Sequence, residues 1–270
     1  TVGIDGLSVP AISGPEVQVQ PTAGLYATAP SGLRVTGTNT TIQNLAIYGF
    51  TSSTTNSTDD ANIYIATGAT GALIRWNVIG TTARTYADPG ATARTTDYGV
   101  LTRVNSVTIR ENLVAFSGAG GVELYDSGAS TLVEANELRS NAVTNVNAEN
   151  LNINTTTTTG AIVRGNLSVN AGGPGFDTSG ATNGGNTFEN NTVTGNGILA
   201  TGQTPGLRIL GPNNIIRKNI IGQNYGAGVL VRSDTTNTGN LITQNSIYAN
   251  GTTGTTPTKQ IGIDLNTDNT

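Results

Sequence analysis

Three side chains in three nearby repeats of this sequence could together perform acid–base chemistry on a saccharide. Glu123, Asp177 and Arg208 each follow the apolar member of a Gly-apolar pair, so strands at these pairs would turn all three to one outward face. With strands ~4.8 Å apart, Glu123 and Asp177 would lie about 9.6 Å apart, near the upper end of the ~6.5–9.5 Å used by inverting glycosidases. Arg208, one rung further, could bind a uronate carboxylate. Asp126 lies just past the strand of Glu123 and could join them.

The same pattern has an ordinary explanation. Any outward row with a few acidic residues offers such a pair, so this row could equally be a solvated face. A second acidic group, Asp59 and Asp60, lies in a Ser/Thr-rich loop and offers the oxygen ligands that calcium takes. Such a pair could also be only a solvated loop. No cofactor other than calcium is indicated.

An internal repeat shows which elements must position these residues. It is a Gly-apolar pair that opens each predicted strand. The pairs are Gly32-Leu33, Gly99-Val100, Gly121-Val122, Gly175-Phe176, Gly206-Leu207, Gly228-Val229 and Gly262-Ile263, with Asn in place of Gly at Asn62-Ile63 and Asn150-Leu151. Because Asn tolerates the left-handed backbone conformation that Gly adopts freely, we expect a corner with positive φ at each pair.

A second repeated motif follows the first and contains a fixed asparagine between two apolar residues. Its members are Asn77, Asn112, Asn136, Asn166, Asn191, Asn219 and Asn245. An unpaired amide pointing inward at a corner would be costly, but amides stacked at rung spacing can bond to one another. The motif therefore predicts a structural asparagine ladder, because a catalytic role would need only one or two such residues.

A row of charged residues accompanies the asparagine motif. It consists of the residues directly after the first apolar position, which are Gln43, Arg75, Arg110, Glu134, Arg164, Glu189, Arg217 and Thr243. From 110 to 217 the charges alternate in sign, and opposite charges on adjacent strands are mildly stabilising. We therefore interpret this charge row as solvated ion pairing and not as a basic binding patch.

These repeats predict an all-β fold, a right-handed parallel β-helix of about nine to ten coils. Each coil holds short strands that cannot bury their apolar side alone, so the coils must stack into a solenoid. We expect one domain over 1–270, with 1–31 as a first coil or N-terminal cap and 32–270 as regular coils. The absence of methionine suggests a piece excised from a longer chain.

Composition excludes several classes of function. The net charge of −4 and the pI near 4.8 argue against a nucleic-acid partner, which normally leaves a basic footprint. The chain contains no cysteine and no histidine, which removes thiol chemistry, the commonest general base and the commonest metal ligand. No apolar run approaches the ~20 residues needed to cross a bilayer, so we expect no membrane insertion by this segment.

The chain resembles the β-helix repeat regions of large secreted or surface-anchored bacterial proteins. The likeness is carried by the opening Ile-Asp-Gly, by the segment from Leu45 to Phe50, by "NVIGTTARTYADPGATARTTDYGV" at 77–100 and by "IGIDLN" at 261–266. It implies a module of a secreted or cell-surface protein with an adhesive or architectural role. Pectate lyases and polygalacturonases share the fold class, but their clustered calcium-binding aspartates and their histidine are not matched here.

Two functional hypotheses follow. The first is a non-catalytic structural or adhesive module that contacts glycans or a cell-surface protein through long loops on one flank, including 80–99 and 248–262. The second is a polysaccharide hydrolase, lyase or glycan binder that uses the face of Glu123, Asp177 and Arg208. The exposed strand edges at the ends of such a rod would also permit end-to-end self-association.

Overall fold

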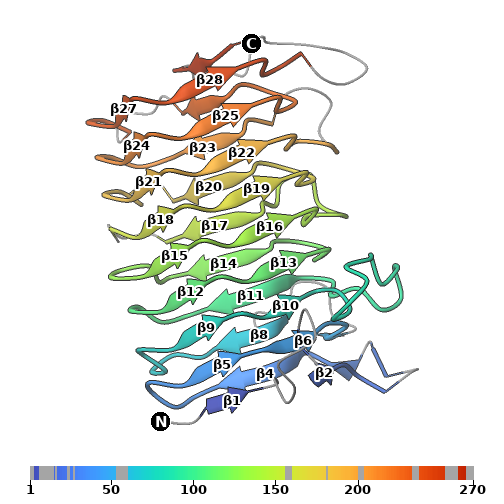
Figure 1. Cartoon of the computed structure of the whole chain (residues 1–270). Coiled ribbons are helices and arrows are strands. Elements are labelled where there is room, and N and C mark those ends of the chain that lie inside the picture. The colour runs from blue at the N-terminus through green and yellow to red at the C-terminus, as the bar shows by residue number, and fades with distance from the viewer. Residues whose placement is uncertain are drawn as a thin grey trace.

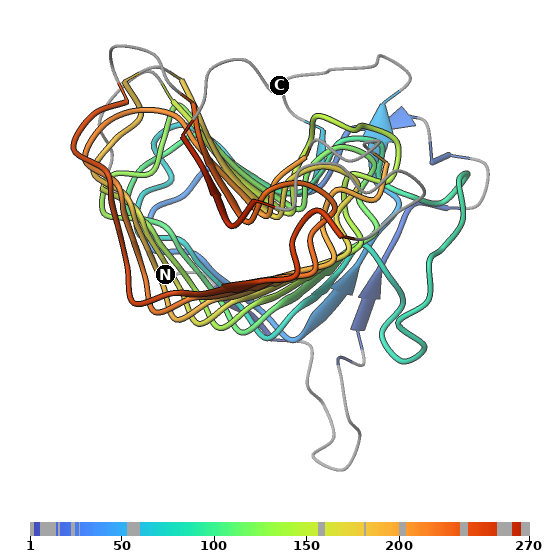
Figure 2. The same cartoon turned by 90° about the horizontal axis from the view of Figure 1, so that it is seen from above.

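The chain winds into a rod of stacked rungs, as shown by a computed structural model (Figure 1). The structure describes residues 3–5, 15, 17–22, 25–26, 28–52, 60–155, 160–180, 182–199, 204–232, 237–252 and 261–265. Seen along the axis, successive rungs superimpose, and one long loop after β10 projects from the flank (Figure 2). Every strand of the rod pairs in parallel with the strands of the neighbouring rungs.

Sheet 1 forms the first wall of the rod. Its nine strands, in order along the axis, are β1 (Gly3–Asp5), β5 (Thr41–Gln43), β9 (Leu73–Arg75), β12 (Thr108–Arg110), β15 (Leu132–Glu134), β18 (Ile162–Arg164), β21 (Thr187–Glu189), β24 (Ile215–Arg217) and β27 (Leu241–Thr243). The middle residue of a typical strand is buried and its two neighbours are more exposed, as alternation requires.

Sheet 2 follows sheet 1 after a sharp corner in every rung. Its strands are β2 (Val17–Val19), β6 (Leu45–Ile47), β10 (Val78–Ile79), β13 (Leu113–Ala115), β16 (Glu137–Arg139), β19 (Leu167–Val169), β22 (Thr192–Thr194), β25 (Ile220–Gly222) and β28 (Ser246–Tyr248). Two residues separate the two strands of each rung from β9–β10 onward, and a single residue separates β5 from β6, so the corner itself must satisfy its own backbone groups.

Sheet 3 completes each rung and carries the residues of the predicted site. Its strands are β4 (Ser31–Val35), β8 (Ala61–Ile65), β11 (Tyr98–Thr102), β14 (Val122–Tyr125), β17 (Leu151–Asn154), β20 (Phe176–Ser179), β23 (Leu207–Ile209), β26 (Val229–Val231) and β29 (Ile263–Asp264). A short antiparallel pair, β3 (Thr28–Ala29) and β7 (Thr51–Ser52), lies beside the rod.

The predicted fold class, a right-handed parallel β-helix with an asparagine ladder, is confirmed. About seven turns are regular, however, and this is fewer than the nine to ten coils predicted. The count was too high because the first two triplets of strands among the described residues lack the corner asparagine and were included. No helix in the described part of the chain is long and apolar enough to cross a membrane.

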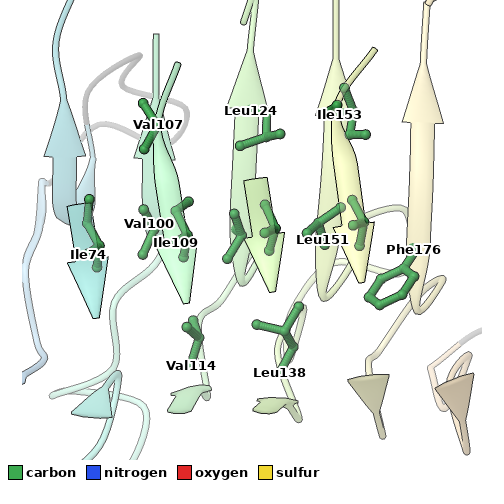
Figure 3. Packing of buried hydrophobic residues seen from close by; sticks show 14 of the residues in the cluster. Ile74, Val100, Val107, Ile109, Val114, Leu124, Leu138, Leu151, Ile153 and Phe176 are labelled. Atoms are coloured by element: carbon green, nitrogen blue, oxygen red, sulfur yellow. The ribbon is translucent and has the colours of Figure 1, made fainter. Parts of the chain in front are cut away.

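Apolar side chains from all three sheets fill the rod in stacks that run along its axis (Figure 3). Ile74 and Ile109 on sheet 1 are adjacent in register, as are Leu124 and Ile153 on sheet 3, and all four are fully buried. Like side chains therefore pack on like side chains from rung to rung, and one cluster runs through the regular turns. Such burial contributes about 1.5–3 kcal/mol for each large side chain.

All seven predicted asparagines form one continuous ladder at the corner between sheets 1 and 2. Each amide nitrogen donates to the Oδ1 atom of the next rung over 2.9–3.0 Å, from Asn77 to Asn112 and onward to Asn245. Each amide nitrogen of Asn77 and its successors also donates to a backbone carbonyl of the preceding rung, as Asn77 does to Ile42. The ladder thus satisfies the inward amides, as predicted.

A second ladder, which the sequence analysis missed, stabilises the corner after sheet 2. Its amides run from Asn141 through Asn150, Asn196 and Asn224 to Asn250, with nitrogen–oxygen distances of 2.9–3.2 Å. Asn150 lies directly before β17, at the other end of the connection that carries Asn141 near its start, and fills the place where the rung of Ala171 has no amide. Before the strands of sheet 1, the Asn186 amide donates to Asn214 Oδ1 at 3.0 Å, and the Asn214 backbone N–H donates to Asn240 Oδ1 at 2.8 Å.

The second ladder also explains the repeated Gly-apolar pairs and corrects our expectation of positive φ there. None of the paired glycines, nor Asn62 or Asn150, has a positive φ. At most of these glycines a side chain would clash with its surroundings instead. At Gly121, for example, a Cβ atom would lie 2.5 Å from Asn150 O and 2.7 Å from Asn141 Nδ2. At Gly121, Gly175, Gly206 and Gly228, glycine is therefore required by the close approach of the next rung and of the second ladder.

The left-handed backbone lies instead directly before each amide of the first ladder. That corner row consists of Asn44, Trp76, Glu111, Ala135, Gly165, Asn190, Lys218 and Gln244, with φ between 54° and 62°. Its side chains are exposed except for that of Asn44, and Asn and Gly are its least strained members. Lys218 is thus a corner residue, which accounts for a lysine in the middle of an apolar run.

The predicted charge row lies in register on the outer face of sheet 1. Arg164 pairs with Glu134 at 2.8 Å and Arg217 with Glu189 at 2.7 Å, both across neighbouring strands. The side chains of both arginines are almost half exposed. Arg110 approaches its neighbour Glu111 at 3.8 Å and makes no ion pair with Glu134 among the described contacts. The alternating charges of sheet 1 therefore form ion pairs at the surface, and such pairs contribute little to stability.

Candidate functional site

The outward row of sheet 3 has the register that the sequence predicts. From β4 to β29 it reads Arg34, Tyr64, Leu101, Glu123, Asn152, Asp177, Arg208, Leu230 and Asp264. Glu123 and Asp177 are two rungs apart with Asn152 between them, and Arg208 follows on the next rung. The structure therefore brings together the three residues that the spacing singled out.

These residues are not on an open face but at the base of a pocket of about 350 Å³. One wall is the segment before β17, which contributes Asn145, Asn147 and Glu149, and another is the start of β11 with Asp97 and Tyr98. Glu123 and Asp177 are only 2% and 1% exposed. We call this the acidic pocket, because Asp97, Glu123, Glu149 and Asp177 all line it.

Arg208 binds two of the carboxyl groups at once. Its Nε and Nη2 donate to the two oxygens of Asp177 over 2.9 and 2.6 Å, and Nη2 also donates to Glu149 Oε1 at 2.9 Å. The paired, nearly planar contact is the strong geometry of an arginine with a carboxylate. Arg208 thus orients Asp177 from the neighbouring strand and attaches the wall residue Glu149 to it.

Glu123 stands apart from this ion pair and has the electrostatics of a protonated acid. Burial raises the pKa of Glu123 to about 8, although hydrogen bonds from Asn154 and Asn152 act to lower it. The amide of Asn152 lies 3.5 Å from Glu123 Oε1 and its own Oδ1 accepts from Ser179 at 3.1 Å. At neutral pH the Glu123 carboxyl group therefore carries a proton that it can donate.

The surrounding groups also resist ionisation. Burial raises the pKa of Glu149 well above its ordinary range, and the charge of Asp177 raises it further against the effect of Arg208. Burial raises the pKa of Asp97 to about 6, with a contribution from Asp60. The pKa of Tyr98 is raised by burial and then by the charge of Glu123. The pocket therefore holds few net charges despite its many titratable groups.

A second outward row lies two residues further along the same strands. Tyr125, Asn154 and Ser179 are in register, and the Arg103 guanidinium lies 4.0 Å from the centre of the Tyr125 ring. All four residues line the acidic pocket. The sequence analysis missed this row, although the same alternation extended by two positions would have found it. It gave no signal for Glu149, which reaches the pocket from a loop.

The remaining predicted site residues lie elsewhere or outside the described residues. Asp126 is exposed at the corner after β14, with a φ of 46°, and does not line the pocket. Asp59 lies outside the described residues. Asp60 is fully buried, and its charge acts on Asp97. Among the described residues no group of three or more acidic side chains is arranged to hold a metal ion.

The long loop at 80–99, which we expected to carry binding residues, contributes to two pockets. Its end supplies Asp97 and Tyr98 to the acidic pocket, and Tyr86 lines a second pocket on the face of sheet 2. The loop is held by an ion pair between Arg94 and Asp88. Burial acts to raise the pKa of Asp88, but the hydrogen bonds from Arg94 and from the Gly90 backbone outweigh it and leave the pKa lowered. Of the other expected loop, 248–262, residues 253–260 lie outside the described part.

The protonated carboxyl group of Glu123 and the ion-paired carboxyl group of Asp177 thus line the same pocket. The rung between them carries the amide of Asn152. Glu123 can donate a proton, Asp177 retains lone pairs on both oxygens with which to accept one, and Asn152 and Asn154 can bond to hydroxyl groups. This arrangement, on the outer face of a parallel β-helix, defines a solenoid with one acid–base pocket.

Known structures agree with this fold. The chain is similar to the crystal structure of an alginate lyase from Paenibacillus sp. str. FPU-7, with a TM-score of 0.54 and 12% identity over 87% of each chain. It is also similar to the Dettilon tailspike protein (gp208), with a TM-score of 0.57 and 17% identity over 85% of this chain and 50% of that one. At such identities the likeness shows the fold alone. No family model and no curated protein sequence matches the chain.

Proposed function

We propose that the acidic pocket binds a neutral glycan and hydrolyses a glycosidic bond with inversion of configuration. The observation that carries this proposal is the pairing of two buried carboxyl groups in different states. Glu123 is held protonated by burial, and Asp177, two rungs away, is paired with Arg208. Environments that separate two neighbouring carboxyl groups in this way are typical of acid–base catalysis.

The spacing supports inversion. Two rungs correspond to about 9.6 Å, which leaves room for a water molecule between the acid and the base. In the reaction, Glu123 gives its proton to the glycosidic oxygen as the bond from that oxygen to the anomeric carbon breaks. Asp177 takes a proton from the water that attacks the anomeric carbon from the opposite side. The products are a free alcohol and a reducing sugar of inverted anomeric configuration.

The charges favour a neutral glycan over a polyuronate. With the pKa values of Glu123 and Glu149 raised, Asp97 and Asp177 remain to balance the guanidinium groups of Arg103 and Arg208, so the pocket offers no excess positive charge. Arg208 is also already bound to Glu149 and Asp177. A uronate carboxylate would therefore have to compete for Arg208 or lie beside other acidic groups. The similar alginate lyase acts on a polysaccharide, which agrees with a saccharide in the pocket but not with the charge of that particular substrate.

The experiment measures turnover and its stereochemistry. We expect release of reducing ends from at least one neutral bacterial or plant polysaccharide, with the inverted anomer seen first by NMR. We expect Glu123→Gln and Asp177→Asn to lower the rate by about 10²–10⁴-fold, the usual contribution of a positioned acid or base. The matched control is Glu189→Gln in the charge row of sheet 1, which removes an equally paired but solvated carboxylate and should leave the rate unchanged.

Other outcomes would favour the alternatives. Unsaturated products from a polyuronate, detected by ultraviolet absorbance, would contradict hydrolysis and indicate a lyase. Saturable glycan binding without turnover, unaffected by Glu123→Gln, would favour a non-catalytic adhesive module, the role expected for an exported bacterial surface protein. Direct staining of intact cells with an antibody against the chain would test that surface location.

A further inference from the structure

We propose a second saccharide-binding site, separate from the acidic pocket, in which aromatic rings hold a neutral pyranose. It is a pocket of about 510 Å³ beside β10, β13 and β16 on the outer face of sheet 2. We call it the aromatic pocket, and its defining residues are Trp76, Tyr86, Phe116, Glu111, Glu137 and Arg139. This proposal does not depend on catalysis in the acidic pocket.

The first observation is that three aromatic side chains converge on one surface hollow. They come from three different places: Trp76 from the corner before β10, Tyr86 from the loop at 80–99, and Phe116 from the corner after β13. Trp76 and Tyr86 are 44% and 47% exposed, which is unusual for rings of this size. The volume lies within the ~300–1,000 Å³ of ordinary ligand sites.

The second observation is that all three rings are carried by left-handed backbone. The φ angles of Trp76, Tyr86 and Phe116 are 56°, 49° and 57°. Bulky residues are rare in this conformation, and such strain gathers at functional sites. At the same two corners other rungs are left-handed as well, some with the tolerant Asn190 and Asn170 and others with residues such as Ala135 and Lys218. The corners themselves therefore impose this conformation, and at the pocket the chain places large rings there, where asparagine or glycine would be less strained.

The charges select the class of ligand. Glu137 forms an ion pair with Arg139, and Glu111 lies 3.8 Å from Arg110, so each carboxylate already has a cation nearby. The Arg75 guanidinium covers one face of the Trp76 ring at 4.0 Å, which would oppose a second cation on that ring. A neutral ligand with an apolar face and hydroxyl groups at its edge, such as a pyranose, matches rings surrounded by paired charges.

Trp76 is the single tryptophan of the chain, so tryptophan fluorescence reports directly on the aromatic pocket. The test is a fluorescence titration with cellohexaose, mannohexaose, xylohexaose and maltohexaose, and with oligogalacturonate and tetramethylammonium as charged comparisons. We expect a saturable change in emission with at least one neutral hexamer. We expect Phe116→Asn and Tyr86→Asn, which keep the tryptophan, to weaken that binding by at least ten-fold.

Matched variants separate binding from folding and from the acidic pocket. Lys218→Asn changes the same corner row away from the pocket, and Glu123→Gln changes the acidic pocket, so both should leave the titration unaltered. Trp76→Asn, followed by calorimetry, should remove the same binding event that Phe116→Asn and Tyr86→Asn weaken, while the Tm stays equal or rises by a few degrees, because Asn44 and Asn190 occupy the same corner.

Three results would overturn the proposal. One is the absence of a saturable change with any neutral hexamer at millimolar concentration. Another is a response only to tetramethylammonium or oligogalacturonate, which would mean a charged ligand. The third is a fall in Tm of several degrees for Trp76→Asn, together with binding that Phe116→Asn and Tyr86→Asn leave unchanged, which would assign the rings to packing.

Discussion

Two outward rows of this molecule have the same geometry and opposite properties. The charge row of sheet 1 and the row of sheet 3 that contains Glu123, Asp177 and Arg208 both place polar side chains one above another at rung spacing. On sheet 1 the ion pairs are open to solvent. On sheet 3 the segment before β17 and the start of β11 cover the row, and burial raises the pKa of Glu123 in the row and of Glu149 in the covering segment.

The difference shows that stacking of the rungs aligns polar side chains in a row, and that the row becomes a pocket with altered pKa values only where loops cover it. In water an ion pair contributes little, because solvent screens both charges. In a covered pocket the same pair is coupled strongly to its neighbours, and a carboxyl group can remain protonated at neutral pH. The loops therefore decide which of several equivalent rows becomes chemically distinct.

The largest difference in stability between the two rows should appear when one arginine is removed from each. Arg208→Met leaves Asp177 buried without its cation, so we expect the free energy of unfolding to fall by about 3–5 kcal/mol. Arg164→Met on sheet 1 should change it by less than about 1 kcal/mol. Urea unfolding of both variants measures the two losses, and equal losses would contradict the contrast.

A smaller contrast should appear in the pH dependence of stability. The ordinary pKa of a glutamate is 4.5, whereas that of Glu123 in the folded protein is about 8. Between these values the unfolded chain releases the proton and the folded chain keeps it, so the free energy of unfolding falls as pH rises, by at most ~1.4 kcal/mol per pH unit. Glu149 acts in the same direction.

Glu123→Gln should remove its share of this slope, and Glu189→Gln in the charge row should not. The measurement is the urea midpoint of the parent and both variants between pH 5 and 8. Activity should follow the same group, with kcat/KM falling above pH about 8 as Glu123 loses its proton. A slope that Glu123→Gln leaves intact would contradict our assignment of the protonated acid.

The smallest effect should come from exchanging a solvated pair. The double variant Glu189→Arg with Arg217→Glu reverses one ion pair of the charge row, in which the two side chains are 16% and 44% exposed. We expect a change within about 0.5 kcal/mol, because the pair is restored in the opposite order. Thermal unfolding of the double variant and both single variants measures it, and a loss above ~2 kcal/mol would show that the row is not solvated.

Periodicity made much of the fold predictable. The fixed position of residues such as Asn112 and Asn219 identified a ladder, and the Gly-apolar pairs gave the register that aligns Glu123 with Asp177. A repeat of this kind works because each rung contacts only its neighbours, so local spacing determines the three-dimensional neighbour.

What escaped prediction depends on features that do not repeat. Glu149 enters the acidic pocket from a loop, and Asn150, at the end of that loop, replaces a missing amide of the next rung. The glycines were expected to turn the chain, but they make space for the second ladder. The convergence of Trp76 with Tyr86 requires the path of the loop at 80–99, which no local pattern specifies.

The hydrogen bonds between the side-chain amides of the ladders have a common direction relative to the rod axis. The amide-to-amide hydrogen bonds of the two ladders all run from the N-terminal toward the C-terminal end of the rod, as does the bond from Asn186 to Asn214 before sheet 1. These bonds therefore share one direction along the axis, much as the peptide hydrogen bonds of an α-helix do. Two rods stacked head to tail would continue this alignment, whereas two rods meeting by like ends would oppose it.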